Sequence, residues 1–67
     1  MEIILNGEKE VLSEEKTVLQ LLAGLELNPE VVTININGNV VPKGEYAAIK
    51  LTNGDEVDVL MFMGGGY

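Results

Sequence analysis

Three Asn-Gly dipeptides divide this chain, at residues 6–7, 37–38 and 53–54. Both residue types tolerate the positive φ angles of a tight primed turn, so an Asn-Gly pair between strand-like runs is a strong turn signal. The first pair lies inside "MEIILNGEKEVL", which predicts a β-hairpin at the start of the chain. The other two pairs predict further turns beside strands in the second half.

A helical pattern follows the first hairpin, in "SEEKTVLQLLAGLEL". Thr17 and Gln20 have the spacing of a capping box, in which two side chains satisfy free main-chain N–H groups at a helix start. Gly24 and the Asn28-Pro29 pair are expected to end the helix. Its apolar residues recur at i, i+3, i+4 and i+7, and this predicted core-facing stripe consists of Val18, Leu21, Leu22 and Leu25.

Period-two alternation returns in "VVTININGNVV", which predicts a strand with one apolar and one polar face. The apolar face is expected to contain Val32, Ile34 and Ile36. "PKGEYAAIKL" has no clear period and predicts a connector with one helical turn and a short strand near residues 49–51. "TNGDEVDVLMFM" then provides the last strand.

The predicted order is therefore hairpin, helix, strand, irregular crossover and strand. This order is that of the β-grasp or ubiquitin-like fold, an α+β class with one mixed sheet and one main helix packed on one face. In that arrangement the last strand lies parallel to the first at the sheet centre. We expect a β-grasp domain over residues 1–63 and a flexible C-terminal glycine tail over residues 64–67.

The composition of the chain argues against several functions. Eleven acidic residues and four lysines, with no arginine or histidine, give a net charge of −7. This charge disfavours nucleic acid, and it either attracts a basic partner or serves solubility. Without histidine or cysteine the chain lacks the usual zinc ligands and nucleophilic dyads, and "NGDEVD" lacks the order of a calcium loop. We expect no catalytic residue, no metal site and no bound cofactor.

The sequence contains no charged-then-apolar leader and no apolar run near membrane-spanning length. These features predict a cytoplasmic protein without a membrane partner. We expect the protein alone to be a monomer.

The last predicted strand departs from its own alternation. Its helix-facing series is expected to be Val57, Val59 and Met61. Two acidic residues begin the outward series, but Leu60 and Phe62 continue it and emerge on the solvent face. With outward-facing Ile4 of the first strand as a neighbour, they predict a small apolar partner surface. The alternative is that the segment around Tyr46 covers Leu60 and Phe62.

The chain ends in "MGGGY". A phosphate-binding loop would need a following helix, which is missing here. Because glycine lacks Cβ, Gly64, Gly65 and Gly66 would let the backbone enter a tunnel too narrow for side chains. If the reacting group is a terminal carboxylate, an ATP-using partner must activate it as an acyl adenylate. The protein would then be that enzyme's substrate; a merely frayed end is the alternative.

Together these segments resemble the ThiS/MoaD family of ubiquitin-like sulfur carriers, and most closely its thiamine-biosynthesis branch. The similarity rests on "IILNGE", "TVLQLLAGLELNPEVVTININGNVVPKGEY", "LTNGDEVDVL" and the diglycine. It implies that a ThiF-like adenylyltransferase activates Gly66 with MgATP while Gly64 and Gly65 thread the active site. It also implies that a cysteine desulfurase or other persulfide donor supplies sulfur, and that a ThiG-like thiazole synthase receives it from the Gly66 thiocarboxylate.

Tyr67 departs from the family pattern, because it holds the terminal carboxylate in place of Gly66. Some related carriers bear residues beyond the diglycine that a zinc-dependent JAMM-type protease removes, so the resemblance implies that Tyr67 is a removable cap. Such capped carriers serve cysteine or homocysteine synthesis, and other members of the family serve molybdopterin synthesis. A non-covalent β-grasp interaction module is the alternative from another class of protein.

Overall fold

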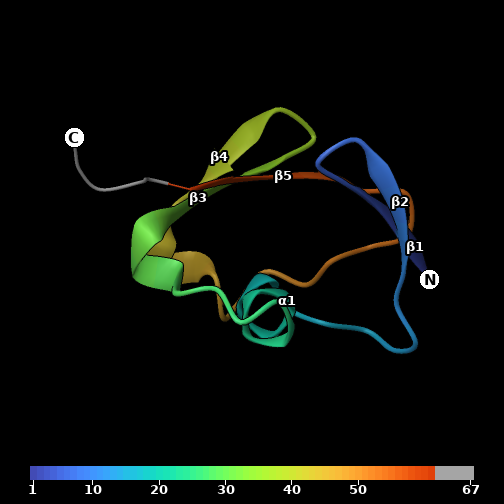
Figure 1. Ribbon diagram of the computed structural model, residues 1–67, viewed down its shortest axis with the longest axis horizontal. Helices are drawn as coiled ribbons and strands as arrows, with labels where there is room; N and C mark the ends of the chain where they lie inside the picture. Colours follow the sequence, from blue (N-terminus) through green and yellow to red (C-terminus); the bar gives the residue numbers. More distant parts are fainter. Residues whose placement is uncertain (62–67) are drawn as a thin grey trace.

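The computed structural model describes residues 1–61. Over these residues the chain forms a five-stranded mixed sheet with the strand order β2-β1-β5-β3-β4, and helix α1 lies below one face of the sheet (Figure 1). The predicted α+β class and β-grasp arrangement are confirmed. The strands are β1 (Glu2–Leu5), β2 (Glu8–Val11), β3 (Val32–Ile36), β4 (Asn39–Val41) and β5 (Glu56–Met61); the helical elements are α1 (Val18–Gly24) and the 3₁₀ turns η1 (Pro29–Val31) and η2 (Lys43–Glu45).

Two of the three Asn-Gly pairs form the predicted tight turns. Asn6 and Gly7 have φ angles of 50° and 85°, and Asn37 and Gly38 have φ angles of 52° and 87°. Positive φ at both central positions is the geometry of a type I′ hairpin turn. The second turn makes β4, a strand that the predicted element order did not count. At the third pair only Gly54 has positive φ, 89°, and the turn leads into β5 without forming a hairpin.

The start of α1 has the predicted capping box. The Thr17 hydroxyl accepts from the Gln20 main-chain N–H at 3.1 Å, and the Gln20 side-chain oxygen accepts from the Thr17 N–H at 2.9 Å. Three of the four predicted stripe residues are buried, namely Val18, Leu21 and Leu22. No helix among residues 1–61 is long and apolar enough to cross a membrane.

The end of α1 differs from the prediction. Gly24 is its last helical residue, but the left-handed residue that turns the chain is Glu26, with a φ of 60°. The Glu26 N–H donates to Ala23 O at 3.0 Å and the Leu27 N–H donates to Leu22 O at 2.9 Å, which is the Schellman pattern. Because the helix stops before Leu25, that side chain is 39% exposed, and its assignment to the buried stripe was wrong.

The connector between β4 and β5 contains the predicted helical turn, η2, but not the predicted strand near residues 49–51. Residues 49–51 lie alongside the residues at the beginning of α1. The Val18 N–H donates to Ile49 O and the Leu51 N–H donates to Lys16 O, both at 2.9 Å. An isolated bridge joins Thr17 to Lys50. The segment therefore pairs with the residues before the helix and stays outside the sheet.

Strand β5 occupies the centre of the sheet, as predicted for the last strand. It pairs in parallel with β1, with Ile4 opposite Glu56 and Leu5 opposite Val57. It pairs antiparallel with β3 from Val57 to Met61. The buried core between the sheet and α1 includes Ile3, Val18, Leu22, Val32, Ile34 and Val57.

Candidate functional site at the end of β5

The beginning of β5 is fixed by side chains from two turns. The Asn37 amide donates to Asp55 Oδ1 at 3.0 Å, and its carbonyl oxygen accepts from the Glu56 N–H at 2.9 Å. The Thr52 N–H donates to Asp55 Oδ2 at 2.8 Å. Burial by itself raises the pKa of Asp55, but the hydrogen bonds from Thr52 and Asn37 outweigh it and hold the pKa below its usual value. The ionised carboxylate of Asp55 therefore connects the segment just before β5 to the β3–β4 turn.

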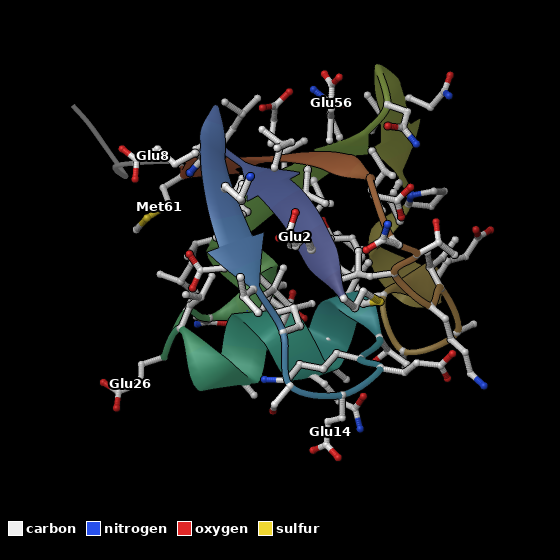
Figure 2. All side chains as sticks on the ribbon, turned by 90° about the vertical axis from the view of Figure 1, so that its right-hand side faces the viewer. Glu2, Glu8, Glu14, Glu26, Glu56 and Met61 are labelled. Atoms are coloured by element: carbon white, nitrogen blue, oxygen red, sulfur yellow. The ribbon has the colours of Figure 1, made fainter. Side chains whose placement is uncertain are left out.

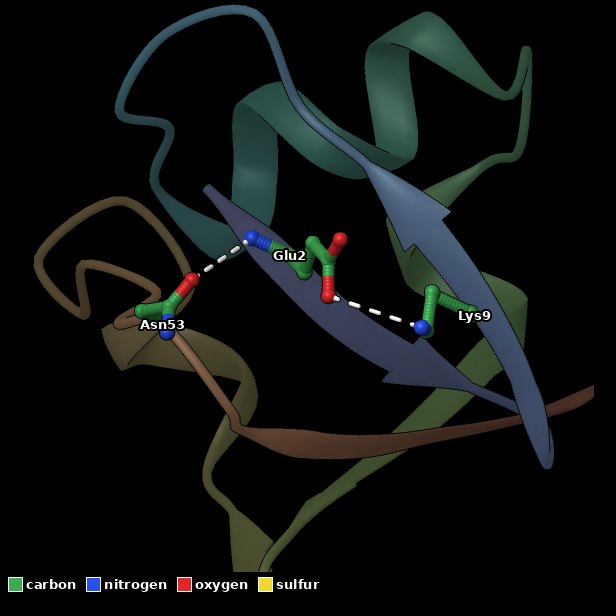
Figure 3. A network of polar contacts seen from close by, with 3 residues as sticks. All are labelled: Glu2, Lys9 and Asn53. Atoms are coloured by element: carbon green, nitrogen blue, oxygen red, sulfur yellow. Dashed lines mark hydrogen bonds and ion pairs between the residues drawn. The ribbon is translucent and has the colours of Figure 1, made fainter.

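The same loop is also attached to the first strand (Figure 3). The Glu2 N–H donates to Asn53 Oδ1 at 2.8 Å, and the Gly54 N–H donates to Glu2 O at 2.7 Å. The ion pair between Lys9 Nζ and Glu2 Oε1 spans 3.8 Å and involves exposed side chains, so it contributes little to stability. One bond to the Asn53 side chain and one main-chain bond from Gly54 thus attach the segment just before β5 to β1.

Among the strands that the structure describes, the far end of β5 has a neighbour on one side only. β1 ends opposite Val57, and beyond it the Asn6 side chain accepts from the Val59 N–H at 2.8 Å. On the other side β3 continues to Met61. Within residues 1–61, the bond from Val59 to the turn residue Asn6 is therefore the last hydrogen bond that β5 makes on its β1 side.

Two side chains anchor β3 opposite this end. The Val32 carbonyl, which pairs in register with Met61, accepts from Lys43 Nζ at 2.7 Å and from the Tyr46 hydroxyl at 3.1 Å. The Tyr46 side chain is 2% exposed, so its hydroxyl donates within the core. These two donors bind β3 beyond the point where β4 ends at Val41. They therefore fix the part of β3 that pairs with the end of β5.

Leu60 is 54% exposed on the sheet face opposite α1, where the alternation of β5 was expected to place it. The alternative that the segment around Tyr46 covers Leu60 is wrong, because Tyr46 is buried against Val32. Met61, expected to face the helix, lies on the helix side opposite Val32 but is 51% exposed. The predicted side of the sheet is therefore confirmed for Met61, but strand alternation does not specify whether another element covers the side chain.

Ile4 also lies on the outer face, in register with Lys9 and Glu56, and is half-buried. It is not a neighbour of Leu60. Its register partner Glu56 precedes Leu60 by four residues, which is about 13 Å along a strand. The predicted continuity between Ile4 and Leu60 is therefore wrong.

The outer face has an apolar residue that the sequence reasoning missed. Val40 is 68% exposed and lies in register with Asn35, which itself pairs with Asp58 of β5. Reading "NGNVV" as the second half of a hairpin would have placed Val40 outward and Val41 inward. Asn35 lies between Val40 and Asp58 in the sheet, and its Oδ1 is buried without a hydrogen-bond partner among residues 1–61. This part of the outer face therefore combines exposed apolar side chains, Leu60 and Val40, with an acceptor that lacks a donor.

The other predicted site residues lie outside the described residues: Phe62 of the apolar surface, the glycines Gly64, Gly65 and Gly66, and the cap Tyr67. Their roles stay predictions. The same holds for the boundary between residues 63 and 64. Within residues 1–61, acidic side chains form no cluster of three or more that could hold a metal ion.

Comparisons with known proteins agree with this geometry. The family model described as "ThiS family" matches residues 1–66. A thiazole synthase from Paramagnetospirillum magneticum is 35% identical over 66 residues, which are 98% of this chain and 20% of that protein. The chain thus spans about a fifth of the length of this relative. The sulfur carrier protein ThiS of Bacillus subtilis is 30% identical over 50 residues, covering 75% of this chain and 76% of that protein.

A solved structure has the same fold. The crystal structure of the thiamine biosynthesis protein (ThiS) from Geobacter metallireducens matches with a TM-score of 0.85 and 35% identity. The match covers 98% of this chain and 100% of that one. The similarity therefore extends over the whole β-grasp domain.

Proposed function

This chain belongs to the ThiS family, and we propose that it is a sulfur carrier protein of thiamine biosynthesis that bears the sulfur on Gly66. The observation that carries the proposal is the span of the family match, which includes Gly64 and Gly65 and ends at Gly66. In this function the protein is a substrate and sulfur donor for partner enzymes. The partners supply the catalytic groups.

The proposed chemistry starts at the Gly66 carboxylate, which water releases by hydrolysis of the Gly66–Tyr67 peptide bond, with Tyr67 leaving as the free amino acid. One oxygen of this carboxylate attacks the α-phosphorus of MgATP in a ThiF-like adenylyltransferase, and pyrophosphate leaves. A sulfur nucleophile supplied by a cysteine desulfurase or other persulfide donor then attacks the acyl adenylate and displaces AMP. When the nucleophile is a persulfide, a thiol must cleave the resulting S–S bond to release the thiocarboxylate. Activation is required because a carboxylate has no good leaving group.

A ThiG-like thiazole synthase is the proposed acceptor of the sulfur. The similarity to a thiazole synthase supports this proposal. This chain spans only about a fifth of that protein, so a carrier-like segment there shares one polypeptide with a much larger part of the enzyme. Such an arrangement keeps donor and acceptor at high effective concentration. We propose that this chain donates its sulfur to an acceptor enzyme of the same class.

The outer face near the end of β5 is the proposed docking surface for these partners. Leu60 and Val40 offer apolar area there. Phe62 stays in the proposal as the next outward residue of the sequence pattern. Ile4 lies on the same face but farther along the sheet, so we assign it to the periphery of this surface.

Tyr67 favours a second candidate function. A carrier with a residue after the modified glycine needs hydrolysis of the Gly66–Tyr67 peptide bond before activation, and a JAMM-type protease is the proposed enzyme. Capped carriers of this kind resemble those that serve cysteine or homocysteine synthesis. The extra residue therefore bears on the acceptor pathway, while the carrier chemistry is the same.

Two matched chains test the proposal, one ending at Gly66 and one ending at Tyr67. With a ThiF-like adenylyltransferase and MgATP, we expect ATP–pyrophosphate exchange for the chain ending at Gly66 and none for the chain ending at Tyr67. Intact-mass measurement after addition of a sulfur donor should then give a product in which one oxygen is replaced by sulfur. Equal exchange with both chains would contradict the cap. No exchange with either chain would favour the non-covalent interaction module.

A further inference from the structure

Within residues 1–61, strand β2 lies at an edge of the sheet and has β1 as its one strand partner. All four of its residues are exposed. At its end Leu12 and Met1 exchange two main-chain bonds, of 2.7 and 3.3 Å. Because bonding alternates along an antiparallel pair, the main-chain groups of Lys9 and Val11 point away from β1. This edge therefore offers main-chain donors and acceptors to another strand.

A groove runs between this edge and α1. It has a volume of about 240 Å³, and its lining includes the apolar residues Val11, Leu12, Leu21 and Leu25 and the polar residues Glu10 and Ser13. Gly24 forms part of the same wall, and Lys16 is the cation that borders it. A strand added to β2 would place the side chain opposite Leu12 over this groove.

The edge is acidic on the side that faces the groove. Glu8 and Glu10 lie in register with Leu5 and Ile3, and Ile3 is fully buried, so both carboxylates are on the helix side of the sheet. Within residues 1–61 the one ion pair joins Lys9 to Glu2, so neither Glu8 nor Glu10 is in an ion pair. Figure 2 shows the Glu8 side chain extending from β2. Two unpaired carboxylates at alternate positions favour a partner strand with two cations.

These carboxylates also disfavour pairing between two copies of this chain. Consider an antiparallel β2–β2 contact in which both helices lie on the same face of the continuous sheet. Even-numbered residues of one copy then lie opposite even-numbered residues of the other. Glu8 would then face Glu10 of the other copy, or Glu10 would face its own counterpart. Like charges directly opposite one another destabilise a strand pair, so the edge selects a different, basic strand.

We propose that the β2 edge binds an extended segment of a partner protein, which adds antiparallel to β2. The segment places an apolar side chain over the groove opposite Leu12 and a lysine or arginine opposite each of Glu10 and Glu8. Main-chain bonds to Lys9 and Val11 provide affinity, and the apolar and basic side chains provide specificity. The antiparallel direction follows from its more stable hydrogen-bond geometry.

The location of this site allows two partners at once. β1 separates β2 from β5, and Figure 1 shows β2 and the Met61 end of β5 on opposite sides of the molecule. A segment on the β2 edge therefore leaves Leu60 and Val40 open. The proposal is independent of the sulfur-carrier function, since it concerns a different surface.

The test uses the full chain labelled with ¹⁵N and the acetylated, amidated peptide TLTKTKT. In the antiparallel register its leucine lies opposite Leu12 and its two lysines lie opposite Glu10 and Glu8. We expect chemical-shift changes and slower amide exchange at Lys9 and Val11, with the amides of Leu60 and Val40 unchanged. The peptide TLTETET is the matched control and should bind about tenfold more weakly or not at all.

Two further arms separate strand addition from simple charge attraction. Methylation of the main-chain nitrogens of the two middle threonines of the peptide removes the donors that pair with β2 and leaves the protein unaltered, so binding should be lost. The paired Glu8→Lys and Glu10→Lys variant should reverse the preference and bind TLTETET. Absence of shifts with TLTKTKT, equal binding by the methylated peptide, or an unchanged preference in the charge-reversed variant would each overturn the proposal.

Discussion

The two ends of β5 are constructed differently, although they belong to one strand. Near Glu56 the strand has β1 and β3 on its two sides, and Asn37 and Asp55 fix its approach. At Met61 β3 is the remaining strand neighbour, and Leu60 is exposed on the outer face. The comparison indicates that one strand can stabilise the fold at its beginning and present a surface to partners at its end. Four substitutions test this division.

The largest effect is expected at the beginning of the strand. Val57 is fully buried, with Leu5 and Ile36 as its register partners, so Val57→Ala removes core packing and leaves a cavity. We expect the free energy of unfolding to fall by about 2 kcal/mol. Urea unfolding followed by far-UV circular dichroism measures this change. Leu60→Ala is the matched truncation at the other end, and an equal loss there would contradict the division.

Asp55→Asn tests the hydrogen bonds that fix the approach to β5. We expect a loss of about 1 kcal/mol at neutral pH, because the amide cannot replace both acceptor contacts of the carboxylate. The pKa of Asp55 is lowered by folding, so its contribution is present above the usual aspartate pKa and disappears as the pH falls through the lower folded value.

The pH dependence supplies the control for this variant. Unfolding free energies of the original chain and the Asp55→Asn variant should differ most at neutral pH and converge below about pH 4. A difference that stays constant down to strongly acidic pH would show that the carboxylate charge is not responsible.

A smaller effect is expected at Asn6, near the end of the strand. Asn6→Gly keeps the positive φ of 50° accessible but removes the acceptor of the Val59 N–H. Since glycine favours this φ, the net loss should be only about 0.5 kcal/mol. Amide exchange at Val59 should nevertheless accelerate. Asn6→Asp retains an acceptor and should keep Val59 protected; rapid exchange in both variants would argue against this contact.

The smallest effect on stability is expected for Leu60→Ser, within about 0.5 kcal/mol, because the side chain is already exposed. Binding to a ThiF-like adenylyltransferase should weaken by about tenfold if Leu60 is central to the interface. Isothermal titration calorimetry measures this affinity. Leu19→Ser, an exposed position on α1, is the control that should bind normally, and equal weakening of both variants would remove the outer face from the proposal.

Much of the fold was predictable because local signals determine it. The Thr17–Gln20 capping box and the turns at Asn6 and Asn37 depend on residues close in sequence, and all three form as expected. The end of α1 was harder to predict, because Glu26 takes a left-handed conformation that the sequence would assign more readily to Gly24. The capping hydrogen bond from the Leu27 N–H to Leu22 O stabilises that conformation.

The candidate site was less predictable because it depends on register and coverage. Alternation correctly placed Leu60 outward, but it could not show that α1 fails to cover Met61. The distance between Ile4 and Leu60 depends on the parallel register of β1 and β5, two strands that are far apart in the sequence. Val40 was not predicted as exposed because its short strand, β4, was not recognised as the second strand of a hairpin with β3.

The central position of β5 in the sheet affects how this protein folds during its synthesis. Chains are synthesised from the amino terminus, and β5 is the last of the described strands, yet it joins the β1–β2 hairpin to β3 and β4. The two halves of the sheet cannot be united until residues 56–61 have left the ribosome. A nascent chain stopped earlier has no central strand, and its exposed apolar faces make it a substrate for chaperones and proteases. The sheet is therefore completed only after all five described strands have been synthesised.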